Sequence, residues 1–173
     1  MDYLFSPWRY RYLTAPRPVS GCVLCAKLAP LPAGEGAEGG QAARDAENLL
    51  LHRAQYNAVM LNLYPYTSGH LMILPYAHVA SLGECGAAAR GEMMELAARA
   101  EAALKAEYRP DGMNLGMNLG EAAGAGIADH LHLHVLPRWV ADANFVTVVG
   151  ETRVLPEELA ATFRRLRPHF APA

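Results

Sequence analysis

Hydrophobic and polar positions alternate along several short segments of this chain, as they do in β-strands that have one buried face. The first three segments are ENLLLH at residues 47–52, YNAVMLNL at 56–63 and GHLMILP at 69–75. Residues 64–69, YPYTSG, supply turn-forming residues between the second segment and the third. The pattern predicts a hairpin from the first two segments, with the third strand paired beside it.

The alternation gives way to a helical pattern from about Ser81 to Tyr108, where alanine, glutamate and leucine dominate. RPDG, residues 109–112, ends this predicted helix because proline and glycine disfavour its continuation. Two more strands are predicted after it, MNLGMNLG at 113–120 and HLHLHVLP at 130–137.

The order of these elements predicts an α+β fold with an antiparallel sheet of about five strands and one long helix. VLPEELAATFRRLRPHF at 154–170 predicts a C-terminal helix. We interpret residues 1–173 as a single domain, which this length allows. Its catalytic core is expected at 47–150, preceded by an aromatic and basic N-terminal arm at 1–20 and a flexible loop at 31–45.

Composition narrows the class of protein. Hydrophobic residues make up 52% of the chain, which is not the composition of a disordered protein. The formal net charge is -2, so bulk charge does not favour nucleic acid as a partner. No apolar run approaches the roughly 20 residues that span a bilayer, and the aromatic N-terminus lacks the apolar region of a signal peptide. We therefore expect a cytoplasmic protein with no membrane partner.

Three of the seven histidines occupy alternate positions: His130, His132 and His134. On a strand they would share one face about 6.6 Å apart, while Leu131 and Leu133 face the core. A packing role does not explain three imidazoles on one face, and two chemical roles stay open. An H-x-H pair can direct two imidazoles at one zinc ion. A neutral imidazole is also a nucleophile near pH 7 and can attack phosphorus without a strong base.

The cysteines indicate a second site. Cys22 and Cys25 form a C-x-x-C pair, a spacing typical of zinc sites, and the odd total of 3 cysteines argues against a disulfide framework. The pair would supply half of a four-ligand zinc site; the alternative is a pair of reduced cytosolic thiols. Cys85 is expected to be a small, partly buried residue.

Two blocks of this sequence resemble the histidine-triad (HIT) family. GAGIADHLHLHVLPRW at 124–139 is similar to the family signature, in which histidines alternate with hydrophobic residues. LNLYPYTSGHLMILPYAH at 61–78 resembles the family's upstream block, in the usual order and spacing. The match runs roughly from residue 20 to 150, and the PRW and PWRYRYL segments resemble most the bacterial branch that includes diadenosine tetraphosphate phosphorylases. The resemblance implies a HIT-like fold.

The resemblance also implies a nucleotidyl hydrolase or transferase without an organic cofactor. His132 matches the family's nucleophile, which attacks the α-phosphorus of a nucleotide and forms a covalent nucleotidyl-histidine. His134 matches the histidine that contacts the phosphate and assists the leaving group. His70 matches the histidine beside the nucleophile.

Positions that would bind the nucleoside are carried over in the same way. Asn62 matches the family's ribose-binding Asp or Asn. Met60 and Leu63 flank it and would line the nucleobase slot, although an ordinary place in the core explains them equally well.

Asn118 matches a phosphate-contacting amide of the family. The loop with Gly124 and Gly126 lies directly before the triad, where its backbone N–H groups would face the charge that develops on the α-phosphate. Many relatives have Gln and Ser or Thr just before the triad, whereas this chain has Gly126 and Ile127. Because of this departure, the sequence does not specify which leaving group the site accepts.

Zinc-bearing members of the family use two histidines that match His78 and His130 here. With Cys22 and Cys25 they would form a closed tetrahedral site, in which zinc is structural. His52 is the weaker alternative for a fourth ligand. The triad would then serve two sites, with its first histidine on zinc and the other two on the phosphate.

Several activities share the expected first step and differ in the acceptor. Water as the acceptor gives a hydrolase, inorganic phosphate gives a phosphorylase of the ATP adenylyltransferase type, and a P–N substrate makes a phosphoramidate hydrolase. We favour dinucleoside polyphosphates such as diadenosine tetraphosphate as the nucleotide substrate. Two other classes stay open: a metalloenzyme with a catalytic zinc on the triad, and a non-catalytic nucleotide-binding protein. The resemblance implies a homodimer, which the aromatic arm would extend to a tetramer.

Overall fold

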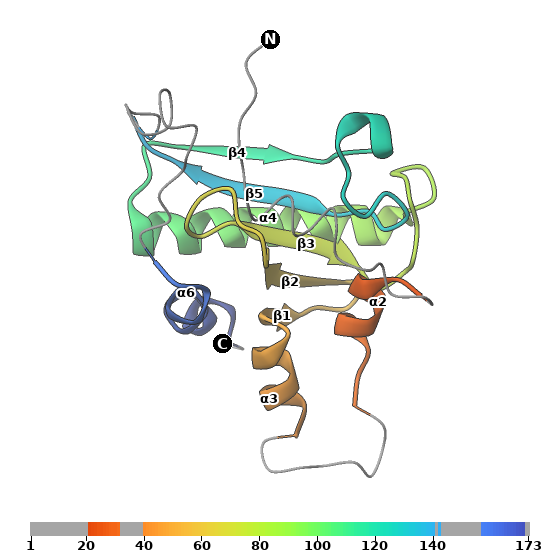
Figure 1. Ribbon diagram of the computed structural model, residues 1–173, viewed down its shortest axis with the longest axis horizontal. Helices are drawn as coiled ribbons and strands as arrows, with labels where there is room; N and C mark the ends of the chain where they lie inside the picture. The colour runs from red at the N-terminus through yellow and green to blue at the C-terminus, as the bar shows by residue number, and fades with distance from the viewer. Residues whose placement is uncertain (1–20, 32–39, 141, 143–156, 172–173) are drawn as a thin grey trace.

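The protein is described here as a computed structural model, which covers residues 21–31, 40–140, 142 and 157–171. Five strands form one antiparallel sheet in the order β1-β2-β3-β5-β4 (Figure 1). The strands are β1 (Leu50–Arg53), β2 (Asn57–Leu61), β3 (Leu71–Pro75), β4 (Gly112–Gly116) and β5 (Leu133–Arg138). The helices are α2 (Val23–Leu28), α3 (Gly40–Glu47), α4 (Ala87–Tyr108) and α6 (Leu159–Leu166), with the 3-10 turns η1 (Glu121–Ala123) and η2 (Arg167–Phe170). This sheet and long helix confirm the predicted fold class.

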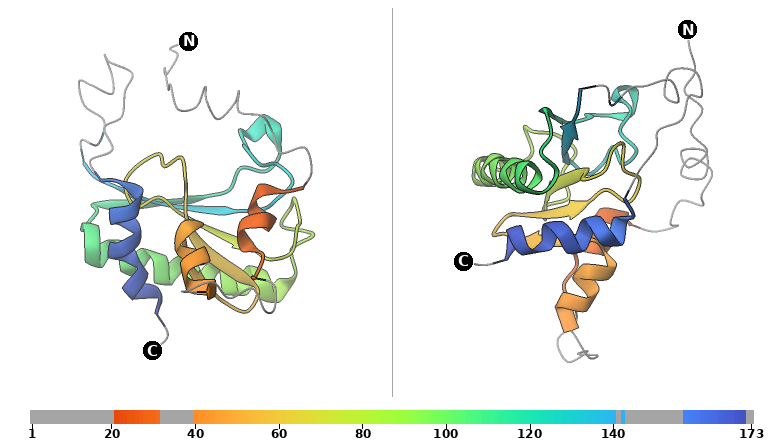
Figure 2. Two further views of the ribbon diagram at one scale, coloured as in Figure 1. Left: turned by 60° about the horizontal axis from the view of Figure 1, so that its bottom comes forward. Right: turned by 90° about the vertical axis from the view of Figure 1, so that its left-hand side faces the viewer.

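Helix α4 covers one face of the sheet (Figures 1 and 2). The helix contributes Met93, Leu96 and Leu104 to a buried cluster that includes Leu131 and Leu133 of the triad segment. The two leucines therefore face the core, as their alternation with histidine predicts. The histidines that alternate with them are directed away from α4, to the opposite side of the sheet.

Helix α2 packs on that opposite side of the sheet. Leu24 and Leu28 bury themselves against Met60, Met72 and other strand residues in a second, smaller cluster. This packing brings the start of α2, and with it the cysteine pair, next to the carboxyl end of β3. The two clusters together explain why the middle strands are buried on both faces.

The predicted strands are right in number and order, but their ends differ. The fifth strand was expected at 130–137 and begins only at Leu133, because the backbone before it bonds elsewhere. The Leu131 N–H donates to the Val79 carbonyl at 2.7 Å, and the His130 carbonyl accepts a side-chain hydrogen bond. The fourth strand, predicted within 113–120 and running into a turn, ends at Gly116, because its partner strand has no ladder beyond that point.

The prediction of a flexible loop at 31–45 is wrong for residues 40–45, which belong to helix α3. Asp45 on this helix pairs with Arg53 of β1 at 2.8 Å and accepts a hydrogen bond from Gln41, one turn earlier. These contacts stabilise a helix that the alanine, glycine and charged residues of this segment do not predict by themselves. The helix also displaces the first strand, which begins at Leu50 instead of 47.

The long helix begins later than predicted, at Ala87 instead of about Ser81. The intervening turn has its own hydrogen bonds, since the Glu84 carboxylate accepts from the Ala80 and Ser81 N–H groups. The C-terminal helix predicted at 154–170 is α6 followed by η2, so its last turn is of the tighter 3-10 type.

Several predictions fall outside the described residues, namely the N-terminal arm at 1–20 and residues 32–39, 143–150 and 154–156 of the expected loop, core and C-terminal helix. Among the described helices, none combines the length and the apolar character that crossing a bilayer requires.

Candidate active site and metal centre

The last two histidines of the triad, His132 and His134, lie where β3 and β5 meet. His134 is on β5, opposite Met72 of β3, and its Nδ1 is 2.8 Å from Nε2 of His70. His70 immediately precedes β3, so the adjacent strands bring together two histidines that are 64 residues apart. The His132 ring lies edge-on to the His134 ring, with centroids 4.8 Å apart. Three imidazoles thus form one buried cluster.

Hydrogen bonds fix which nitrogen of His70 carries a proton. The backbone N–H of Tyr66 donates to His70 Nδ1 at 3.1 Å, so this nitrogen has no proton of its own. Burial, with the nearby His134 and His132, lowers the pKa of His70 to about 3, and the ring is neutral near pH 7. Its single proton is therefore on Nε2, which donates to His134.

The same reasoning extends to His134. Burial, and the nearby His132, lower the pKa of His134 to about 4. Because Nδ1 of this neutral ring accepts from His70, its proton is on Nε2. His134 therefore presents an N–H donor from the far side of its ring.

His132 has the opposite arrangement. Its Nδ1 is 2.7 Å from the His130 carbonyl oxygen, which can only accept, so Nδ1 carries the proton. In the neutral ring the Nε2 lone pair is then free for attack. The adjacent rings of His132 and His134 thus offer a free lone pair and an N–H donor, the two functions that transfer at phosphorus uses.

Asn62 lies beside this cluster, as its place in the sequence block predicts. Its side-chain Nδ2 is 3.3 Å from His70 Nδ1, and its Oδ1 accepts from the Tyr64 N–H at 3.0 Å. The two flanking hydrophobic residues differ from each other: Met60 is 2% exposed in the cluster under α2, whereas Leu63 is 45% exposed. Burial of Met60 favours the core role that the sequence left open for it.

The expected phosphate loop is on the surface before the triad. Gly124 adopts φ of 86°, ends η1, and donates its N–H to the Glu121 carbonyl at 2.9 Å. That N–H is therefore engaged within the turn. Gly126 is exposed and Asn118 is half-buried on the segment after β4.

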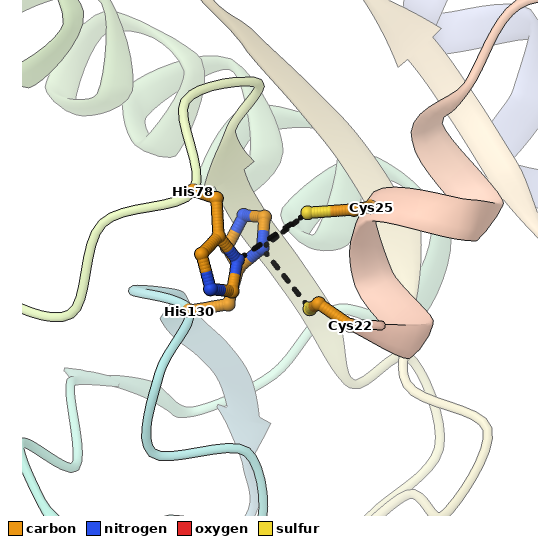
Figure 3. Close-up of side chains that lie close together, drawn as sticks. All are labelled: Cys22, Cys25, His78 and His130. Atoms are coloured by element: carbon orange, nitrogen blue, oxygen red, sulfur yellow. Dashed lines mark hydrogen bonds between the residues drawn. The ribbon is translucent and has the colours of Figure 1, made fainter. Parts of the chain in front are cut away.

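The first triad histidine belongs to a different cluster (Figure 3). Its Nδ1 is 3.4 Å from Sγ of Cys22 and 3.4 Å from Sγ of Cys25, and Cys25 Sγ is also 3.4 Å from Nδ1 of His78. One potential ligand atom from each of the four residues lies within 4.8 Å of the others. Cys22 and Cys25 come from the start of α2, and His78 follows β3.

The geometry of these four residues fits zinc. Zn–S bonds of about 2.3 Å and Zn–N bonds of about 2.0 Å give a tetrahedron whose S–N edge is roughly 3.5 Å. Three observed S–N distances are 3.4 Å. His130 Nε2 lies 2.9 Å from the Pro75 carbonyl and so carries the proton, which leaves one lone pair on Nδ1 facing two sulfurs. A thiol proton satisfies only one of these contacts, whereas a bound cation satisfies both.

The structure thus divides the triad between two sites. In the part of the chain that it describes, the Cys22, Cys25, His78 and His130 set is the group that could hold a metal ion, and His132 and His134 are not in it. This does not support a catalytic zinc on the triad itself. His52, the alternative ligand, instead contacts the Phe170 carbonyl with its Nδ1 at 3.0 Å.

Sequence reasoning missed one residue of the histidine cluster, Tyr66. Its ring lies 4.7 Å from the His70 ring and 5.8 Å from the His134 ring, besides the backbone N–H that fixes the His70 tautomer. An aromatic residue in the turn directly before His70 was the available signal. The Pro75 carbonyl that orients His130 gives no signal in sequence, because any residue supplies a carbonyl.

Comparisons with known proteins show which family this chain is similar to. The profile of the HIT domain family matches residues 44–140, more than half of the chain. The AP-4-A phosphorylase of Mycobacterium tuberculosis (strain ATCC 25618 / H37Rv) is 42% identical over 127 residues, which are 73% of this chain and 65% of that protein. The matched segment therefore spans less than two thirds of that relative.

One further relative and one solved structure are also similar to this chain. The asymmetrical bis(5'-nucleosyl)-tetraphosphatase of Schizosaccharomyces pombe is 24% identical over 93 residues, 54% of this chain and 50% of that protein. Among solved structures, a Zn-bound histidine triad family protein from Mycobacterium smegmatis superposes with a TM-score of 0.58 and 26% identity, over 70% of this chain and 83% of that one.

Proposed function

The chain belongs to the HIT domain family, and from that premise we propose that it is a nucleotidyltransferase or hydrolase of dinucleoside polyphosphates. Similarity to a mycobacterial AP-4-A phosphorylase supports diadenosine tetraphosphate as the substrate type. The observation that carries the mechanism is the 2.7 Å contact between His132 Nδ1 and the His130 carbonyl, which leaves Nε2 as the nucleophilic atom.

In the proposed first step, the His132 Nε2 lone pair attacks the α-phosphorus of the substrate. A P–N bond forms and the P–O bond to the rest of the polyphosphate breaks, so the leaving oxygen gains the electron pair. With diadenosine tetraphosphate the products are AMP bound to His132 and ATP. The His134 ring lies next to the His132 ring, and its Nε2–H would donate a hydrogen bond to the phosphate or leaving oxygen, which stabilises the charge that develops there. Asn62 would contact the ribose, and Asn118 with the loop that carries Gly126 would contact the phosphate. The Gly124 N–H of this loop is engaged in its own turn.

The second step transfers AMP from His132 to an acceptor. Water gives AMP and makes the protein a hydrolase, whereas inorganic phosphate gives ADP and makes it a phosphorylase. We favour the phosphorylase, because the similarity to the AP-4-A phosphorylase is much higher than that to the tetraphosphatase. A phosphoramidate hydrolase and a binding protein without turnover are the alternatives.

We also propose that zinc binds at Cys22, Cys25, His78 and His130. The Zn-bound solved relative supports this, in addition to the S–N distances. Four protein ligands leave no open position, so zinc would supply a rigid cross-link between α2 and the start of the triad segment and no Lewis acid for the substrate. A cytoplasmic location, which we propose as well, would keep the thiols reduced.

We further propose that the protein forms a homodimer. β4 is the last strand of the sheet, with most of its residues exposed, and Leu115 on it is 43% exposed. A strand edge with exposed hydrophobic side chains is a surface that a second copy can cover.

The experiment that tests the enzymatic proposal is a single-turnover reaction. Excess protein is mixed with diadenosine tetraphosphate, with and without inorganic phosphate, and quenched for intact mass spectrometry and nucleotide analysis. We expect an AMP adduct on the wild type and none on His132→Ala or His132→Gly, with ADP formed only when phosphate is present. AMP formed in the absence of phosphate would identify a hydrolase instead. Bound nucleotide without adduct or turnover would refute the enzymatic proposal and favour a binding protein.

A further inference from the structure

His130 connects the cysteine–histidine cluster directly to the nucleophile. Its ring Nδ1 faces the two cysteine sulfurs at 3.4 Å, while its own backbone carbonyl accepts the Nδ1–H of His132 at 2.7 Å. One residue therefore contacts the metal centre with its side chain and sets the orientation and tautomer of the nucleophile with its main chain.

The backbone that carries this carbonyl has few other supports. His130, Leu131 and His132 precede β5 and make no ladder hydrogen bonds. Besides the burial of the Leu131 side chain in the core, two hydrogen bonds hold the segment: the His130 Nε2–H bond to the Pro75 carbonyl at 2.9 Å and the Leu131 N–H bond to the Val79 carbonyl at 2.7 Å.

Both acceptors lie close to His78 in the chain, and the His78 and His130 rings contact each other edge-on with centroids 5.3 Å apart. The cluster is thus a further support of the segment and joins it to α2.

We propose that metal occupancy of this cluster controls the position and tautomer of His132, so that His130 is a positioning residue for the nucleophile and the cluster does more than stabilise the fold. The expected effect on the rate of adduct formation rests on the proposed function, whereas the effect on the His132 tautomer does not. Without the cross-link, the His130 carbonyl shifts and the His132 proton redistributes between its two nitrogens, which removes the Nε2 lone pair in part of the molecules. A displacement of about 1 Å at a reacting group costs roughly 100-fold in rate.

The test uses the full-length protein loaded with zinc and the variant His78→Ala. His78 is exposed, so its removal breaks the cluster with little loss of packing. The matched control is His169→Ala, a histidine that lies far from the cluster in the chain and whose Nε2 is 2.7 Å from a carboxylate oxygen of Glu107. Three quantities are measured: zinc content, the tautomer of His132 from ¹⁵N NMR of its ring, and the rate of AMP-adduct formation with diadenosine tetraphosphate.

We expect His78→Ala to lose zinc, to show a mixture of His132 tautomers, and to form the adduct roughly 10- to 100-fold more slowly. Its dissociation constant for AMP should stay within about 2-fold of the wild type, because the structure places His78 in the metal cluster and not beside His70 or Asn62. His169→Ala should match the wild type in all three quantities. Chelation of the wild type, followed by return of Zn²⁺, should switch the tautomer reversibly.

Loss of zinc with an unchanged tautomer and an unchanged rate of adduct formation would overturn the proposal. Unfolding of the whole protein on chelation would also overturn it, because the cluster would then serve folding alone. If the wild type forms no adduct at all, the proposed function fails. The NMR measurement then still decides between a metal-dependent and a metal-independent His132.

Discussion

His132 and His134 are two residues apart, yet the structure gives them opposite tautomers. His132 keeps its proton on Nδ1 because a carbonyl faces that atom, and His134 keeps its proton on Nε2 because His70 donates to its Nδ1. A ring with a free Nε2 lone pair and a ring with an Nε2–H donor thus arise from one residue type through their different hydrogen bonds. The neutrality of His70 and His134 is essential to this arrangement.

That neutrality predicts a pH dependence of stability. The folded pKa values of about 3 for His70 and about 4 for His134 lie below the ordinary 6.5. The unfolded chain therefore binds more protons below pH 6.5, and the free energy of unfolding falls as the pH falls from 6.5 towards 4. At pH 5 the loss is on the order of 2 kcal/mol for each histidine.

The measurement is urea denaturation of the wild type and His70→Gln at pH 7 and pH 5. The variant should be less stable than the wild type at pH 7. Because glutamine does not titrate, its free energy of unfolding should fall less between pH 7 and pH 5, by about the contribution of one histidine. Equal losses in both proteins would show that protonation of His70 does not contribute.

Gly69 positions His70 at the entrance to β3, and alanine should be poorly tolerated there. Its φ is +77°, and an added Cβ would lie 2.9 Å from Leu104 Cδ2 and 3.3 Å from Pro137 Cγ. We expect Gly69→Ala to lower the free energy of unfolding by about 2 kcal/mol or more and to slow adduct formation, since the turn must shift His70.

Gly91 provides the matched control. It lies on α4 with nothing within 4 Å of an added Cβ. Gly91→Ala should therefore raise stability by roughly 0.5–1 kcal/mol, as in other exposed helix positions. A neutral Gly69→Ala in the same thermal and chemical denaturation measurements would contradict the steric account.

At the scale of elements, one side chain ties α4 to the turn between β1 and β2. The Glu92 carboxylate accepts from the backbone N–H groups of Gln55, Tyr56 and Asn57 at 2.8–2.9 Å, and from the Asn57 side chain at 2.8 Å. Partial burial would raise the pKa of Glu92, but these hydrogen bonds outweigh it and lower the pKa. The long helix is thereby fixed against the sheet that carries the histidines.

Glu92→Gln should weaken this connection by about 1–3 kcal/mol at pH 7, because charge-assisted hydrogen bonds become neutral ones or are lost. Since the folded pKa is below the ordinary 4.5, the contribution is complete above pH 4.5 and disappears as the pH falls through the folded value. The variant and wild type should therefore converge in acid. Glu95→Gln, an exposed site on the same helix, should stay within about 0.5 kcal/mol of the wild type in the same chemical denaturation series.

At the scale of the whole molecule, the proposed homodimer would use the free side of β4. Leu115 and Leu119 are 43% and 44% exposed on β4 and the segment that follows it. We expect a dimer in light scattering, and Leu115→Lys should shift it towards monomer because a charge would be buried at the strand edge. Leu82→Lys changes a leucine of similar exposure outside the sheet and should leave the dimer intact. A monomeric wild type would refute the dimer proposal.

The sequence by itself determined the features that depend on local periodicity. Alternation of histidine and leucine specified that Leu131 and Leu133 face the core and that the histidines do not, since successive side chains of an extended chain point to opposite sides. It also placed the strands in order and the stop of the long helix before Pro110. The cysteine spacing was sufficient to indicate half of a metal site.

The tertiary structure decided what each of these residues contacts. Periodicity does not say where a strand stops, so the departure of His130 from β5 follows only from its bonds to Pro75 and the cysteines. Nor does it reveal α3, which depends on the distant partner Arg53. The tautomers of His130 and His132 were likewise set by main-chain carbonyls, which every residue has and no sequence pattern marks. That of His134 was set by His70, which only the pairing of β3 and β5 brings beside it.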